Sequence, residues 1–286
     1  MTTATANPAA DRSRMKGAAL ALPALLLLLG FFVAPVLSLL VQSVTEPSFG
    51  LQNYRELIAT PTYATVFFNT FLVATLVTFF ALVLGFPVAW ALAVLPPRWA
   101  GVIFAVVLLS MWTNLLARTY AWMVLLQTTG VVNKSLMALG IIDTPLALIN
   151  NLTGVTIGMV YIMLPFIILP MQATLRTIDP ATLQAAALCG ASRWQAFWRV
   201  LLPLALPGIA SGGLIVFVMS LGYFVTPALL GGTSNMMLAE LIAQLVQSLL
   251  RWGMGGAAAF VLLVITLALY AVQVRYLGAG RTAVGG

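Results

Sequence analysis

Residues that could carry out proton transfer or bind a metal are scarce in this chain. Its 286 residues include no histidine, one cysteine (Cys189) and six acidic residues. Acid–base catalysis relies mostly on histidine and carboxylates, and zinc sites rely on histidine and cysteine. The acidic residues lie between or at the ends of hydrophobic runs, with Glu240 near a predicted membrane boundary. We therefore expect neither an enzyme nor a chain that itself binds a cofactor or metal.

The longest polar interruption, residues 179–207, has the sequence features of two short helices. Asp179 is followed by a proline, which is typical of an N-cap and a first helical position. Gly190 permits a turn, and Ser192 with Gln195 three residues later fits a capping box for a second helix. These features predict a helix–turn–helix to which another protein could bind.

The composition indicates an integral membrane protein. Hydrophobic residues make up 62% of the chain and charged residues 7%, which is too apolar for a water-facing surface. At about 20 apolar residues per helix, six crossings fit, and no alternating strand pattern favours a barrel. We expect crossings at 17–41, 64–93, 102–126, 152–175, 208–230 and 257–276, with shorter helices at 54–58, 132–139 and 238–250. The predicted parts are a tail at 1–16, a transmembrane domain at 17–278 containing the loop 176–207, and a tail at 279–286.

The net charge of +7 reports membrane orientation rather than nucleic-acid binding. If the N-terminus is inside, nine of the 13 basic residues lie on the cytoplasmic side and three lie outside, with Arg118 within the third crossing. Positively charged loops stay in the cytoplasm. Both termini and the 179–207 segment are therefore predicted to be cytoplasmic.

No energy source is visible within the chain. The P-loop pattern for ATP binding is absent, and the crossings hold no pair of acids for proton relay. A cation-coupled transporter would usually need an intramembrane carboxylate. Either a partner supplies energy, or the protein is a self-sufficient secondary transporter or a channel.

The 179–207 segment resembles the EAA motif of permease subunits of bacterial ABC importers. The family motif is Glu-Ala-Ala, three residues, glycine, nine residues, and Ile-x-Leu-Pro. This chain keeps the spacing, with glutamine in place of the glutamate and valine in place of the isoleucine. The matching residues are Gln184, Ala185, Ala186, Gly190, Val200, Leu202 and Pro203.

The resemblance extends over residues 52–276, where three segments are similar to the spermidine/putrescine permease branch: 112–122, 140–145 and 224–232. It implies an all-α, six-helix type I ABC importer permease in the bacterial inner membrane. It also implies a second permease subunit, two ATP-binding subunits that hold ATP and Mg, and an extracytoplasmic solute-binding protein, within membrane lipids. Permeases of that branch commonly carry acids where this chain has Tyr223 and Ala228. The expected cargo is therefore a polyamine, an opine or an amino-acid-like solute.

Two sets of residues are candidates for a functional role, the first from the resemblance and the second from the residue types. The ATPase-docking set is Gln184, Ala185, Ala186, Gly190, Ser192, Arg193, Leu202 and Pro203. The possible solute passage comprises Trp112, Asn114, Arg118, Tyr120, Trp122, Tyr223, Thr226 and Glu240. Arg118 could instead reach the outer interface or pair with Glu240, and the aromatic residues could anchor the helices at the interface.

Overall fold

A computed structural model describes residues 22–277, which form helices and no strand. The predicted tails at 1–16 and 279–286 lie outside the described residues. Five helices are long and apolar enough to cross a membrane, and a bent pair brings the number to six. Within residues 22–277 the six predicted crossings agree with this number if the bent pair is counted as one span, and two of them are built differently from expectation.

Three of the spanning helices agree closely with the predicted ranges. The first runs over Leu22–Thr45 and contains the π-helical η1 (Leu29–Val33) and α2 (Ala34–Thr45). The others are α4 (Pro61–Val94), which contains Pro87, and α8 (Leu152–Leu175). The last spanning helix, α14 (Trp252–Leu277), begins five residues earlier than predicted. The short helices α3 (Gln52–Ala59) and α7 (Val131–Ala138) also lie where short helices were predicted.

The prediction of one continuous helix over 102–126 is wrong. The segment consists of α5 (Pro97–Trp112) and α6 (Leu115–Leu126), and the chain bends by 99° between them. Asn114 caps the second helix, because its side-chain oxygen accepts hydrogen bonds from the backbone N–H groups of Leu116 (2.9 Å) and Ala117 (3.2 Å). Asparagine is a strong N-cap residue, so it begins a new helix within an apolar run.

The predicted crossing at 208–230 is also wrong in its bounds. A continuous helix of 29 residues runs over Arg193–Leu221 and comprises α10 (Arg193–Ala196), π-helical η2 (Phe197–Leu201) and α11 (Leu202–Leu221). Gly222 ends it, and α12 (Val225–Leu230) is separate. After η3 (Thr233–Asn235), the predicted 238–250 helix is α13 (Leu238–Ala243) continued by π-helical η4 (Gln244–Ser248).

The main core lies around α8, which packs between α4 and α11. Met159, Met163, Ile167 and Met171 recur at helical spacing and are almost completely buried. Two glycines of α11, Gly208 and Gly212, let its backbone approach α8 closely. Through this packing, α8 contacts both α4 and α11, the helices that connect to the candidate sites.

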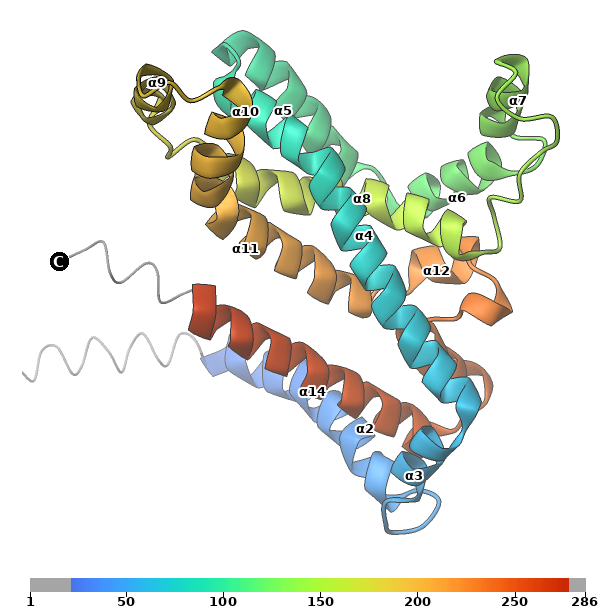
Figure 1. Cartoon of the computed structure of the whole chain (residues 1–286). Coiled ribbons are helices and arrows are strands. Elements are labelled where there is room, and N and C mark those ends of the chain that lie inside the picture. The colour runs from blue at the N-terminus through green and yellow to red at the C-terminus, as the bar shows by residue number, and fades with distance from the viewer. Residues whose placement is uncertain (1–21, 278–286) are drawn as a thin grey trace, which may run out of the picture.

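The connecting helices gather at two ends of the molecule (Figure 1). α9 (Pro180–Leu188) and α10 lie at the same end as the C-terminal end of α14, whereas α3, α7 and α12 lie at the other. The charge bias predicts this grouping, with the first end in the cytoplasm.

Candidate functional site

The helices of the predicted docking segment form as their sequence indicates. The Asp179 carboxylate accepts a hydrogen bond from the backbone N–H of Ala181 (2.8 Å) and caps α9. The Ser192 hydroxyl accepts from the Gln195 N–H (3.2 Å), and the Gln195 side-chain oxygen accepts from the Ser192 N–H (2.9 Å). The predicted N-cap and capping box are confirmed, and both helices have satisfied N-terminal backbone donors.

The turn between α9 and α10 requires glycine. Gly190 has a φ of 85°, in the left-handed region that other residues rarely adopt. The Ala191 N–H donates to Ala186 O (3.0 Å) and the Gly190 N–H donates to Ala187 O (3.0 Å). This pair of bonds is a Schellman motif, which satisfies carbonyl groups at the end of α9. The spacing from Ala186 and Ala187 to Gly190 thus has a backbone reason in this chain.

The helix pair buries almost nothing within its own chain. α9 and α10 contain no buried residue. Leu188 is 90% exposed and Trp194 is 69% exposed, and Gln184, Ala185 and Arg193 are exposed as well. A group of exposed apolar residues at one end of a membrane protein is typical of a surface that a partner covers.

The predicted docking residues Leu202 and Pro203 lie elsewhere than the rest of the set. They belong to the first turn of α11, where Pro203 is exposed and Leu202 is half-buried. Because α10, η2 and α11 are one continuous helix, these residues join the exposed pair to the membrane-spanning part without a loop.

The candidate passage residues near the bend of α5 and α6 are divided between structural and exposed positions. Asn114 caps α6, Trp112 is 86% exposed and Tyr120 is about half exposed. Arg118 donates from Nη1 to the carbonyl of Ser110 (2.6 Å), and its buried Nε has no partner. Arg118 therefore fastens the end of α5 to α6 across the bend.

The alternative ion pair between Arg118 and Glu240 is not formed. Within residues 22–277 the one ion pair joins Arg251 to Glu56 (2.9 Å), and both side chains are more than one-third exposed. Glu240 lies half-buried in α13, outside the spanning helices, and burial raises the pKa of its carboxyl group. Sequence reasoning missed the contact between Arg118 and Ser110 because that contact depends on the bend between α5 and α6.

Two other passage residues lie together under α6. Thr226 is completely buried, and its hydroxyl is 3.4 Å from that of Thr119. Tyr223 lies beside Thr226, and burial raises the pKa of its hydroxyl group, while a hydrogen bond with Thr226 and the charge of Arg118 act in the opposite direction. The structure thus brings Arg118, Tyr223 and Thr226 to the contact of α6 with α12, and leaves Glu240 on a separate helix.

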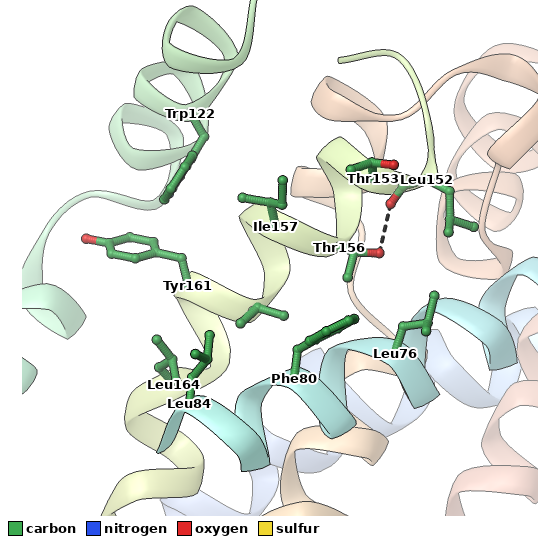
Figure 2. A pocket seen from close by; sticks show the side chains of 11 residues that line it. Leu76, Phe80, Leu84, Trp122, Leu152, Thr153, Thr156, Ile157, Tyr161 and Leu164 are labelled. Atoms are coloured by element: carbon green, nitrogen blue, oxygen red, sulfur yellow. Dashed lines mark hydrogen bonds between the residues drawn. The ribbon is translucent and has the colours of Figure 1, made fainter. Parts of the chain in front are cut away.

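A cavity of about 550 Å³ is mostly apolar and lies between α4, α6 and α8. Figure 2 shows Trp122 of α6 beside Tyr161 of α8 at one side, with Leu76, Phe80 and Leu84 of α4 opposite. The rings of Trp122 and Tyr161 meet edge to face, with centroids 5.6 Å apart. Among the predicted passage residues, Trp122 alone lines this cavity.

Sequence reasoning missed Tyr161, Thr153 and Thr156, which also line the cavity. The Thr156 hydroxyl donates to Leu152 O (2.8 Å), as buried threonines in helices often do. The sequence pattern that could have identified them is a set of hydroxyl-bearing residues spaced along one face of α8, which is otherwise apolar.

The matched family is described as a binding-protein-dependent transport system inner membrane component, and the match covers residues 18–277. The chain belongs to this family. It is a permease subunit of an ABC importer of the bacterial inner membrane, as the motif resemblance predicted. Family membership also separates it from the alternative of a self-sufficient secondary transporter or channel.

Two relatives show where the permease stands within the family. It is 35% identical over 223 residues to the spermidine/putrescine transport system permease protein PotB of Salmonella typhimurium (strain SL1344), covering 78% of this chain and 77% of that protein. It is 36% identical over 254 residues to the inner membrane ABC transporter permease protein YdcU of Escherichia coli (strain K12), covering 83% and 78%.

The fold is shared with a solved transporter. A chain of a bacterial alginate ABC transporter, crystallised with an alginate pentasaccharide-bound periplasmic protein, matches with a TM-score of 0.72 at 21% identity. The match covers 93% of the permease and 96% of that chain. The type I importer permease fold expected from the motif is therefore confirmed.

Proposed function

We propose that this permease imports a small organic solute and is driven by ATPase subunits that bind α9 and α10. The observation that carries the proposal is the exposed, capped helix pair with the EAA spacing, continuous with a spanning helix. In the proposed complex, Gln184, Ala185 and Ala186 lie in a cleft of the ATPase. ATP and Mg are held by that partner, and this chain supplies the surface that receives the movement.

The continuous helix gives the movement a direct route into the membrane. When ATP closes the two ATPase subunits, α9 and α10 are displaced, and α11 tilts with α10 because no loop separates them. Helix α8 follows, since α11 packs closely along it. Pro165, Pro170 and Pro203 lack a backbone donor and are proposed as the places where these helices bend. The result is an exchange of inward for outward access.

The proposed cargo is a polyamine, an opine or an amino-acid-like solute. The name of the relative PotB supports an organic cation. The cavity fits the carbon chain of such a solute because its walls are apolar, and Trp122 and Tyr161 offer aromatic faces to an ammonium group. A solute-binding protein is proposed to select the cargo, so a thermal-shift screen of that protein against polyamines, opines and amino acids identifies it.

The proposed assembly contains a second permease subunit and two ATP-binding subunits. The permease exposes large apolar residues along its spanning helices, which lipids and a second permease would cover. Purification of the tagged permease should bring the ATPase subunits with it, and uptake should stop when hydrolysis is blocked.

Gly190 provides the test of coupling. In Gly190→Val, a β-branched residue must adopt a φ near 85°, which costs at least about 1–2 kcal/mol and reorients α9 against α10. We expect ATP-driven uptake to be abolished, with membrane insertion unchanged, measured in vesicles that contain the whole complex.

The matched control is Gly190→Asn. Asparagine tolerates the left-handed region, and a side chain at this position meets nothing within 4 Å in this chain. This variant should keep measurable uptake. Wild-type uptake in Gly190→Val would contradict the coupling role of the helix pair.

A further inference from the structure

A cluster of five aromatic rings joins α10 and η2 to α4. Phe197, the first residue of η2, lies at the centre. Its ring meets Phe86 edge to face at 5.7 Å and Trp90 at 6.2 Å between centroids. On its own helix it stacks with Trp194 at 6.1 Å and meets Trp198 edge to face at 5.4 Å. We call these five residues the aromatic clamp.

The aromatic clamp connects α4 with α10 and η2, whose backbones make few close contacts with α4. Close backbone contacts join α4 to α5, α8 and α11, whereas α10 and η2 contact mainly α9 and α11. Phe86 and Trp90 are four residues apart, so they lie on one face of α4 and both reach the same ring. Aromatic pairs in such geometries contribute free energy beyond their buried area. The ring of Phe197 therefore links η2, which continues α10, to α4, in addition to the packing of α11 on α4.

The packing beside the clamp is loose toward α9. A cavity of about 260 Å³ lies between α4, α9, α10 and η2, beside the direct contacts of α9 with η2, and Leu183, Trp90 and Phe197 are among the residues that line it. A displacement of α9 reaches Phe197 by two routes, through the turn at Gly190 and α10, and through the contacts of α9 with η2. From Phe197 it passes to α4 through the ring contacts with Phe86 and Trp90.

Beyond the clamp, α4 leads to the wall of the large cavity. Leu76, Phe80 and Leu84 of α4 face α8 across it (Figure 2). The end of α4 nearest the clamp is also tied to the end of α8, because Arg176 donates from Nη2 to Leu92 O (3.3 Å). A movement of α4 at the clamp thus reaches both walls of the cavity.

We propose that Phe197 is a positioning residue that transmits the movement of the docking helices to α4, separately from the covalent route through α11. This inference rests on the proposed coupling function. Without the ring, the ATPase still binds α9 and α10 and hydrolyses ATP, but α4 no longer follows and the cavity does not change its access.

The test uses the whole importer, reconstituted with its ATPase and solute-binding protein. In Phe197→Ala, we expect ATPase subunits to co-purify as in wild type and ATP hydrolysis to continue. Solute imported per ATP should fall about tenfold, within the range of coupling free energies between sites. Phe197→Tyr keeps the ring and should retain wild-type coupling. Phe86→Ala removes the same contact from the α4 side and should give the same loss.

The matched control is Phe79→Ala. Phe79 lies on α4 and meets Phe80 edge to face at 5.4 Å, but it makes no ring contact with the docking helix. This variant should import a normal amount of solute per ATP.

Three outcomes overturn the inference. In the first, Phe197→Ala keeps the wild-type ratio of solute to ATP. In the second, Phe197→Ala loses its ATPase subunits, which would make Phe197 part of the docking surface. In the third, the control Phe79→Ala shows the same loss of solute per ATP. If the wild-type permease fails to bind any ATPase, the proposed function itself fails, and that result is distinct from the other three.

Discussion

A single buried amide, Asn133, holds together the loop that carries α7. Its Nδ2 donates to Gln127 O (3.1 Å) and Leu146 O (3.0 Å), and its Oδ1 accepts from the Leu146 N–H (2.8 Å). The side chain is completely buried, so water cannot reach its polar atoms and these bonds satisfy them instead. Residues 13 apart are thereby fixed against each other without a second helix.

Replacing this amide tests the role of the loop in stability. Asn133→Asp keeps the shape but turns two donors into an acceptor facing carbonyl oxygens, and we expect it to destabilise the loop by about 1–3 kcal/mol or more. Limited proteolysis should then cleave between residues 127 and 146 faster than in wild type. Ser135→Ala, an exposed change on the same helix, should leave the cleavage rate unchanged.

Residue-scale features were predictable where they depend on neighbours in the sequence. The caps at Asp179 and Ser192 involve partners two or three residues away, and the structure confirms them. The partner of Arg118 was not predictable, because Ser110 comes within reach only after the chain bends by 99°. Asn133 was not identified because Leu146, 13 residues away, comes within reach only when the loop folds back.

At the scale of elements, close contact between α11 and α8 depends on glycine. A Cβ on Gly208 would lie 2.6 Å from Cβ and Oγ1 of Thr174 and 3.3 Å from Cα of Met171. By contrast, a Cβ on Gly213 would find ordinary contacts at 3.6 Å or more. The two positions lie on one helix and differ mainly in the space beside them.

This difference predicts opposite effects of the same substitution. Gly208→Ala should push α11 away from α8 and destabilise the permease by about 1–3 kcal/mol. Gly213→Ala should be neutral or slightly stabilising, because alanine lowers the entropy of the unfolded chain. Thermal unfolding of the two purified variants in one detergent compares them directly. Equal unfolding temperatures would contradict the close packing of α11 on α8.

Hydrophobic length predicted the number of spanning helices but not all of their bounds. The run at 102–126 is apolar on both sides of a more polar centre, and Asn114 divides it there. The mean hydropathy of the run does not show this division. Pro203 and Pro207 suggested the end of a loop, whereas the structure carries them within one helix. Proline is tolerated in membrane helices where local adjustments such as the π-helical turn η2 satisfy the backbone.

At the scale of the whole molecule, the orientation in the membrane is still a prediction from charge. The single cysteine of the chain, Cys189, tests it because it is exposed in the turn after α9. A maleimide that cannot cross membranes should label Cys189 in inside-out vesicles and leave it unlabelled in right-side-out vesicles. Bound ATPase should reduce labelling if it covers α9 and α10.

The matched control moves the thiol to the opposite end. In the double variant Cys189→Ser and Lys134→Cys, the thiol lies on exposed α7 at the other end of the molecule (Figure 1). It should be labelled in right-side-out vesicles alone. Labelling of Cys189 from outside would reverse the predicted topology and remove α9 and α10 from reach of a cytoplasmic ATPase.

The pairing of the first spanning helix bears on how the cell makes this protein. Helix α2 packs mainly against α14, and Gly256 of α14 lies directly against the backbone of Leu39. The helix at 22–45 therefore finds its main partner only when α14, more than 200 residues later, has been synthesised. Until then its apolar surface faces lipid or an insertion chaperone. Truncation before residue 252 should leave an inserted but unpaired first helix, a natural substrate for membrane quality-control proteases.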